Sequence, residues 1–123
     1  MNGDQKIAFL EQFGVEARGA VTNMMGIETY DEILNDFYES IDSELSKIEN
    51  FKNLSDMPNY AILVHAMKSN ARSFGFMKLG EIAYNHEMAS KAGDIAYVNE
   101  HYSEFLSAAS EVKQIIEKYK MLG

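Results

Sequence analysis

One histidine in this chain lies close to two cations at helical spacing. His65, Lys68 and Arg72 occur in the segment "YAILVHAMKSNARSFGF", residues 60–76. On a helix that turns about 100° per residue, Arg72 falls roughly 20° and Lys68 roughly 60° from His65. Apolar residues gather on the opposite side of the same helix: Tyr60, Leu63, Val64, Met67, Ala71 and Phe74. The spacing therefore predicts an exposed histidine with two cations beside it.

The chemistry that this face favours is phosphoryl transfer. An exposed imidazole has a pKa near ~6.5, so at neutral pH most copies keep a free nitrogen lone pair, and nearby cations favour that neutral form. A phosphoryl group brings about two negative charges, which Lys68 and Arg72 could offset through charge-assisted hydrogen bonds. Spacing alone leaves a second interpretation open, in which His65 is an ordinary surface histidine with basic neighbours.

Charge is distributed unevenly along the chain. The formal net charge is −8, from 19 acidic and 11 basic residues. Residues 57–80 contain no carboxylate but hold Lys68, Arg72 and Lys78, so this segment carries +3 and the remainder −11. His65 therefore lies in a cationic segment of an otherwise anionic chain, with no carboxylate near it in the sequence. An acidic chain repels phosphate backbones and anionic lipids, so we also expect neither nucleic-acid binding nor binding to a membrane surface.

Length and composition indicate one domain spanning residues 1–123. A chain of 123 residues that is 46% hydrophobic can bury a core without a covalent staple. The absence of Cys excludes disulfides, thiolate zinc sites and cysteine nucleophiles. No apolar run approaches the ~20 residues that span a bilayer, and Asp4 and Glu11 stand where a signal peptide would be basic and then apolar. We expect a cytoplasmic protein.

Apolar residues three and four positions apart predict an all-α fold, an antiparallel four-helix bundle over residues 28–122. The first stripe follows Thr29 and Glu32, whose spacing is that of a capping box. It contains Tyr30, Ile33, Phe37, Ile41, Leu45 and Ile48. Residues 1–27 are expected to cover one end of the bundle with two short helices, around residues 7–13 and 17–25.

Proline and glycine mark the other helix ends. Pro58 can open a helix that runs to about Phe74, and Gly75 can close it in the left-handed conformation. The next helix is predicted from about Met77 to Gly93. Asp94 is placed to cap one long final helix. Its apolar seam contains Ile95, Val98, Tyr102, Phe105, Ala109, Val112, Ile116 and Tyr119.

Two other functional classes have little support in the sequence. A di-iron bundle would need Glu-x-x-His motifs, and none of the three histidines follows a glutamate at that spacing. A Ser-His-Asp hydrolase would need a nucleophile elbow or a glycine-rich oxyanion loop, and neither is present.

The segment around His65 resembles the histidine-containing phosphotransfer (HPt) domains of bacterial and plant phosphorelays. Their signature is a histidine, a lysine three residues later, a small residue after that, and a glycine ten after the histidine; here these are His65, Lys68, Ser69 and Gly75. The similarity continues through "LGEIAYNHEMASKAGD", residues 79–94, including Glu87 and the Gly93-Asp94 turn. It extends more loosely to the helix from Tyr30 and to residues 14–30, so it covers most of the chain from about Gly14. Many members carry glycine where Ser69 stands, and Arg72 adds charge beyond the motif.

The resemblance implies a role for each of these residues. His65 would take a phosphoryl group on Nε2 from a receiver-domain aspartyl phosphate and pass it to another receiver aspartate. Lys68 would stabilise the phosphoryl oxygens, Ser69 would leave room for the receiver, and Arg72 and Gly75 would belong to the docking surface. The expected partners are a response-regulator receiver domain and/or a hybrid sensor histidine kinase. Mg²⁺ would come from the receiver, and the chain would need no cofactor of its own.

The sequence predicts a phosphoryl carrier and leaves one alternative open. The chain has no ATP-binding fingerprint, so we expect a monomeric phosphoryl carrier without autokinase activity and not an enzyme. The alternative is a non-catalytic interaction module that keeps the bundle and docks a signalling partner without the chemistry.

The other two histidines are not expected to accept phosphoryl groups. His86 continues an apolar stripe with Leu79, Ile82 and Ala83, where the HPt family usually has an aliphatic residue. We expect it to be mostly buried and hydrogen-bonded to a neighbour. His101 has no basic companions and is predicted to be a surface residue.

Overall fold

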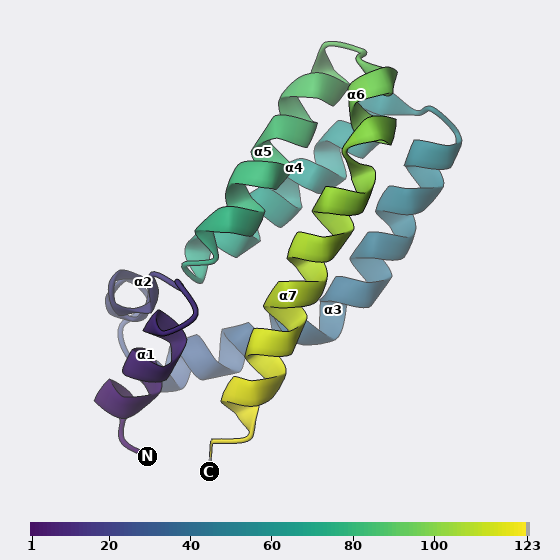
Figure 1. Cartoon of the computed structure of the whole chain (residues 1–123). Helices are drawn as coiled ribbons and strands as arrows, with labels where there is room; N and C mark the ends of the chain where they lie inside the picture. Colours follow the sequence, from purple (N-terminus) through teal and green to yellow (C-terminus); the bar gives the residue numbers. More distant parts are fainter. Residues whose placement is uncertain (123) are drawn as a thin grey trace.

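The computed structural model describes residues 1–122, which form seven helices and no strand. Four helical segments run alongside one another as a bundle, which confirms the predicted all-α fold (Figure 1). The first three bundle helices are α3 (Ile27–Asn53), α4 (Met57–Ser73) and α5 (Met77–Lys91). The fourth segment consists of α6 (Ile95–Glu100) and α7 (Tyr102–Lys120).

The helix that carries His65 begins and ends at the residues that the sequence indicates. The Asp56 side chain caps α4 by accepting a hydrogen bond from the Asn59 backbone N–H at 3.2 Å, and Pro58 lies in the first turn. Gly75 follows the helix with φ of +90°, a conformation that a Cβ disfavours. The chain therefore reverses within three residues, and α4 and α5 become antiparallel neighbours.

The predicted capping box at Thr29 and Glu32 is wrong. Helix α3 begins three residues earlier than a cap at Thr29 would allow, at Ile27, and its N-cap is Gly26 with φ of +131° and no side-chain cap. Thr29 is instead the third residue of the helix. Gly26 can adopt the positive φ seen at this N-cap, so the helix can start before Thr29.

The prediction of one continuous final helix is also wrong, because the helix breaks at His101. This residue has φ of −102° and ψ of 11°, outside the helical range, and separates α6 from α7. Its carbonyl lies 3.1 Å from Nε2 of the buried His86. The apolar seam nevertheless continues across the break, since Val98, Tyr102 and Phe105 are all buried.

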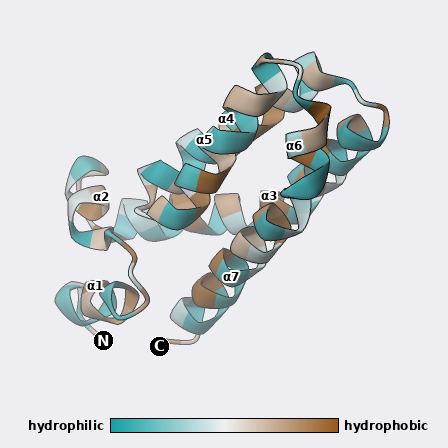
Figure 2. Cartoon of the chain, turned by 45° about the horizontal axis from the view of Figure 1, so that its top comes forward, coloured by the Kyte–Doolittle hydropathy of each residue, from teal (hydrophilic) through white to brown (hydrophobic). Residues whose placement is uncertain are grey.

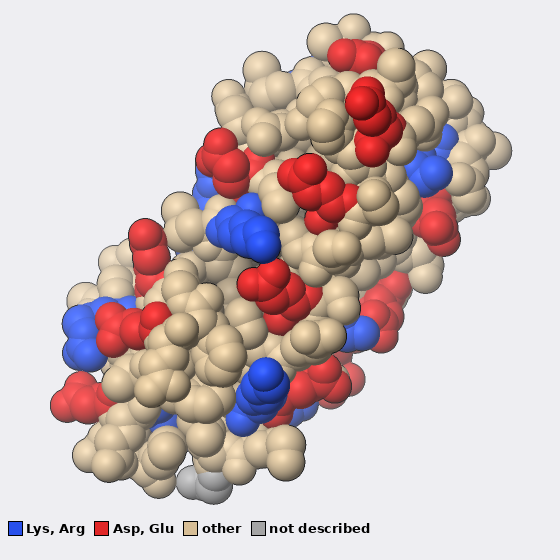
Figure 3. All heavy atoms as spheres, viewed as in Figure 1, with Lys and Arg blue, Asp and Glu red and all other residues tan. Residues whose placement is uncertain are grey.

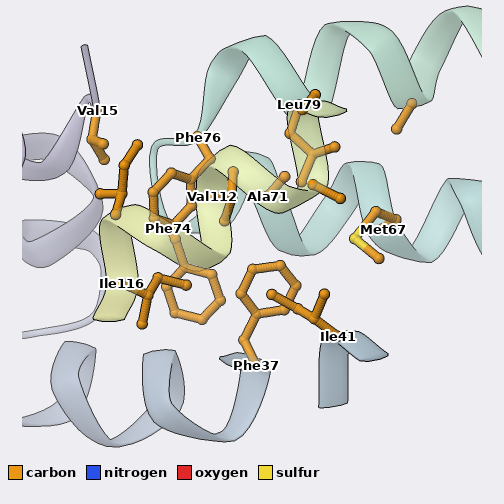
Figure 4. Close-up of a cluster of buried hydrophobic side chains, with 14 of the residues drawn as sticks. Val15, Phe37, Ile41, Met67, Ala71, Phe74, Phe76, Leu79, Val112 and Ile116 are labelled. Atoms are coloured by element: carbon orange, nitrogen blue, oxygen red, sulfur yellow. The ribbon is translucent and has the colours of Figure 1, made fainter. Parts of the chain in front are cut away.

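Aromatic and aliphatic side chains from all four bundle segments meet in the core (Figure 4). The rings of Phe37 from α3 and Phe74 from the end of α4 stack with centroids 5.2 Å apart. The Tyr30 hydroxyl donates a hydrogen bond to the Phe74 carbonyl at 2.9 Å, which satisfies a buried acceptor at the end of α4. Each bundle helix carries hydrophobic and hydrophilic residues together, as expected for helices with one face on the core (Figure 2).

Two short helices cover one end of the bundle, as predicted. They are α1 (Gly3–Glu11) and α2 (Ala17–Asn23), and they lie at the end where both termini are found (Figure 1). Leu10 and Val15 are buried against the core. The Glu16 backbone N–H donates to the Gly75 carbonyl at 2.9 Å, so the covering segment is fixed directly to the α4–α5 turn.

Acidic side chains are spread over the face seen in Figure 3, with lysine and arginine side chains between them. Cross-helix ion pairs join some of them, such as Lys78 with Glu111 at 3.1 Å and Lys113 with Asp42 at 2.6 Å. Among the helices of residues 1–122, none is long and apolar enough to cross a membrane.

Candidate functional site

His65 lies on the outer face of α4, as the helical spacing predicts. Its side chain is 55% exposed, whereas Val64 and Met67 on the other face are buried. The imidazole is therefore anchored on one side by the helix and open to solvent on the other.

A carboxylate lies beside His65 in space, although none is near it in the sequence. Glu87, from the facing helix α5, places Oε2 2.7 Å from His65 Nδ1. The Glu87 side chain is only 2% exposed, which is unusual for a carboxylate. Glu87 is 22 residues from His65 in the sequence, and the antiparallel packing of α4 on α5 brings the two together.

Two lysines complete the surroundings of the Glu87 carboxylate. Lys68 Nζ lies 2.6 Å from Oε1, and Lys91 Nζ lies 2.7 Å from Oε2. Burial alone would raise the pKa of Glu87, but the hydrogen bonds from its three partners outweigh burial and lower the pKa to about 2. Glu87 is therefore ionised at neutral pH and can only accept hydrogen bonds.

An ionised Glu87 determines which nitrogen of His65 carries the proton. Because the carboxylate only accepts, the neutral imidazole must donate through Nδ1–H, and Nε2 keeps its lone pair. Glu87 also limits rotation of the ring about its side-chain bonds. The arrangement gives an exposed nucleophilic nitrogen, a buried carboxylate that stabilises positive charge on the ring, and lysines nearby.

Arg72 extends the cationic side of the site. Its guanidinium lies over the ring of Tyr84 at 5.5 Å from the centroid, and Lys68 Nζ lies 5.6 Å from the same centroid. The Arg72 stem runs close to Gly80, where a Cβ would be only 2.8 Å from Arg72 Cγ. Gly80 thus leaves the space that Arg72 occupies.

Ser69 and Gly75 differ in burial, although both belong to the same sequence motif. Ser69 is exposed on the His65 face, and its small side chain leaves the surface beside the ring open. Gly75 is buried, and its carbonyl accepts the hydrogen bond from Glu16. A Cβ at Gly75 would lie 2.4 Å from the Glu16 carbonyl oxygen. The placement of Gly75 in the docking surface therefore needs correction: its direct role is to shape the α4–α5 turn.

A shallow groove of about 520 Å³ opens beside His65 between α4 and α5. Ile62, which is 63% exposed, provides apolar surface next to the imidazole. The groove is lined by Pro58, Ala61, Ile62, His65, Glu87, Ser90 and Lys91. Apolar and charged atoms thus meet at the ring, a composition typical of protein docking surfaces.

His86 is fully buried and hydrogen-bonded, as predicted. Its Nε2 faces the carbonyl of His101 at 3.1 Å and therefore carries the proton, while Nδ1 accepts from the Tyr60 hydroxyl at 2.8 Å. Burial lowers the pKa of His86 and outweighs the hydrogen bond to His101, which raises it. Both ring nitrogens are occupied by structural bonds.

His101 is half-buried at the break between α6 and α7. Its Nδ1 lies 3.7 Å from Oε2 of Glu104, and no lysine or arginine is paired with it. In residues 1–122, no group of three His, Cys, Asp or Glu side chains has an arrangement that could hold a metal ion.

Comparison with protein-family models places this site within a known family. The model described as "Hpt domain" matches residues 32–118, which include His65, Glu87 and most of the bundle. A search of curated proteins found no match, and a search of solved structures found none either. The family match covers well over half of the chain. The chain therefore belongs to the Hpt domain family, whose members carry phosphoryl groups in the phosphorelays of two-component systems.

Proposed function

We propose that His65 accepts a phosphoryl group on Nε2 from the aspartyl phosphate of one receiver domain and passes it to the aspartate of another. The observation that carries this proposal is the 2.7 Å hydrogen bond between Glu87 and Nδ1 of an otherwise exposed ring. It leaves Nε2 unprotonated and directed away from the carboxylate. A surface histidine without a function would not need a buried, ionised partner, whose desolvation is costly.

The transfer step can be written with all atoms and charges accounted for. The Nε2 lone pair forms the N–P bond while the bond between phosphorus and the aspartyl oxygen breaks, and the aspartate leaves with that electron pair. The ring keeps its Nδ1 proton and becomes cationic, and Glu87 stabilises this charge. In the second transfer, the next aspartate attacks phosphorus and the N–P electrons return to Nε2.

The surrounding residues support the transfer in different ways. Lys68 would stabilise the phosphoryl oxygens, and Arg72 would add positive charge at the edge of the site. Ser69 and the groove beside Ile62 would leave space for a receiver domain to approach Nε2. The receiver would supply the Mg²⁺ ion that offsets phosphate charge in such reactions. The chain would act as a monomer that binds one receiver domain at a time. That receiver would belong either to a response regulator or to a hybrid sensor histidine kinase.

Incubation with a ³²P-labelled phosphorylated receiver domain tests the proposal. The expected product is a labelled protein whose label is labile in acid and stable in base, as phosphohistidine is. His65→Gln should abolish the label and lower the free energy of unfolding by about 1 to 3 kcal/mol, because Glu87 loses the imidazole as a partner but keeps Lys68 and Lys91, so the variant should stay folded. A wild-type protein that binds the receiver but never takes up label would instead be a docking module without phosphotransfer.

A further inference from the structure

The Glu87 carboxylate has more cationic partners than its charge requires. Lys68 bonds to Oε1, and Lys91 bonds to Oε2 together with the Nδ1–H of His65. One negative charge therefore faces two ammonium groups and a neutral ring. The cluster holds one positive charge in excess before any phosphoryl group arrives.

Lys68 is already engaged in this resting state. Its Nζ lies 2.6 Å from Glu87 Oε1, and its side chain is only 14% exposed. A phosphoryl group on His65 would bring about two negative charges onto the same face and compete with Glu87 for this ammonium. If Lys68 turned to the phosphoryl oxygens, a carboxylate with a 2% exposed side chain would lose one of its two lysines.

Lys91 is placed to keep Glu87 paired during that exchange. It lies one turn after Glu87 on α5, its Nζ is 2.7 Å from Oε2, and its side chain is 58% exposed. It approaches the carboxylate oxygen that Lys68 does not use. Its bond therefore does not depend on where Lys68 points.

We infer that Lys91 is a positioning residue: by holding the charge of Glu87, it releases Lys68 to the phosphoryl group on His65. This inference rests on the proposed function, since it assumes that His65 carries the phosphoryl group. Lys91 itself does not touch the phosphoryl group but acts through Glu87. Without Lys91, Lys68 remains bound to Glu87 and is not available to the phosphoryl group.

A double-mutant cycle between Lys91 and Glu87 tests the inference. Lys91→Ala should shift the transfer equilibrium from phosphohistidine toward the receiver by roughly threefold to tenfold. The same substitution in a Glu87→Gln background should have no effect, because Lys68 then has no carboxylate to hold it. Persistence of the Lys91→Ala effect in that background would show direct contact with the phosphoryl group and overturn the inference, as would an unchanged equilibrium in the single variant.

Two matched variants control for charge alone. Lys78→Ala removes the same charge from the same helix, where Lys78 pairs with Glu111 at 3.1 Å, and it should leave the equilibrium unchanged. Lys91→Arg keeps the cation and should restore most of the wild-type value. If Lys78→Ala shifted the transfer equilibrium as much as Lys91→Ala does, the effect of Lys91 would come from its charge alone and not from its contact with Glu87.

A second measurement uses the wild-type chain and does not depend on the folding of the Glu87 variant. The ¹⁵N signals of the lysine ammonium groups are compared before and after phosphorylation. The Lys68 signal should move and the Lys91 signal should keep its position; the reverse pattern would refute the inference. If the wild-type protein takes up no label at all, the proposed function itself has failed, which this comparison separates from a failure of the Lys91 role.

Discussion

At the scale of single residues, the two ring nitrogens of His65 have different surroundings. Nδ1 faces a buried carboxylate at 2.7 Å, while the ring as a whole is about half exposed. Glu87 remains an anion in this position because Lys68 and Lys91 both bond to it. The reactivity of His65 therefore depends on a residue that a receiver domain would not touch.

The ionisation of Glu87 predicts how stability depends on acid. Its pKa is lowered from 4.5 to about 2 in the folded chain, so its contribution is fully present above pH 4.5. This contribution is lost as the pH falls from 4.5 toward 2, because the carboxyl of the unfolded chain takes up a proton in this range while Glu87 of the folded chain stays ionised. A shift of this size corresponds to a loss on the order of 3 kcal/mol.

Urea unfolding of the wild type and of Glu87→Gln between pH 6 and 2.5 measures this contribution. The wild type should lose more free energy of unfolding than the variant over this range, since the amide does not titrate. Parallel pH curves for the two proteins would mean that the lysines do not stabilise the Glu87 anion.

At the scale of the helices, the α4–α5 turn determines where Glu87 lies relative to His65. Gly75 has φ of +90° and packs against the backbone of Glu16. The turn is thus shaped by the covering segment as well as by its own sequence. Displacement of this turn would change how α5 presents Glu87 to α4.

The Gly75→Ala variant tests this packing. It should be destabilised by roughly 2 to 4 kcal/mol in urea unfolding, because left-handed strain adds to a clash at 2.4 Å with the Glu16 carbonyl oxygen. Gly14→Ala is the matched control, since Gly14 has φ of +80° but nothing within 4 Å of the added Cβ. This control should lose only about 1 to 2 kcal/mol. Equal losses would show that the contact with Glu16 has no energetic role.

His86 connects three helical segments, and its replacement should be costly. His86→Leu removes the partner of the Tyr60 hydroxyl, which is fully buried on α4, and should destabilise the fold by about 1 to 3 kcal/mol. Adding Tyr60→Phe removes the orphaned hydroxyl and should recover part of the loss. Thermal melting of the single and double variants measures this recovery. A single variant as stable as the wild type would show that the bond to Tyr60 contributes nothing.

Much of the helical arrangement could be predicted because local signals determine it. Pro58, Gly75 and Asp94 each act on their own backbone, and the structure confirms the helix ends that they mark. The break at His101 was not predictable in this way. The apolar seam runs through it without interruption, and its carbonyl is held by His86 from another helix.

The candidate site could be predicted only in part for the same reason. His65, Lys68 and Ser69 lie on one helix face, so their spacing is sufficient to group them. Glu87 and Lys91 belong to the next helix, and nothing in the spacing around His65 points to them. The resemblance includes Glu87 in its similar region but gives it no role, and only the antiparallel packing of the two helices shows that it is the partner of His65.

At the scale of the whole molecule, the site is a basic and apolar region on an acidic protein. The formal charge is −8, yet Lys91 lines the His65 groove and Lys68 bonds to Glu87 beside His65, with Arg72 over the ring of Tyr84 nearby. A partner that approaches elsewhere meets mostly acidic side chains. Receiver docking is therefore expected to be oriented by charge before the apolar contacts form.

Access to His65 can be tested with a bulky residue at Ser69. Ser69→Trp should slow phosphoryl exchange with a receiver by at least about tenfold, because the indole would occupy the exposed surface next to the ring. A small phosphodonor such as phosphoramidate should still label His65 at nearly the normal rate. Receiver exchange at the wild-type rate would move the docking surface to another part of the bundle.

The occupation of Nδ1 by Glu87 also has a consequence for the regiochemistry of the product. Phosphohistidine exists as two positional isomers, which differ in stability and are distinguished by ³¹P NMR and by isomer-specific antibodies. With Nδ1 held at 2.7 Å from a buried carboxylate, this chain should form only the tele isomer, even with a small donor that reaches either nitrogen in free histidine. An antibody raised against the pros isomer should therefore never detect it.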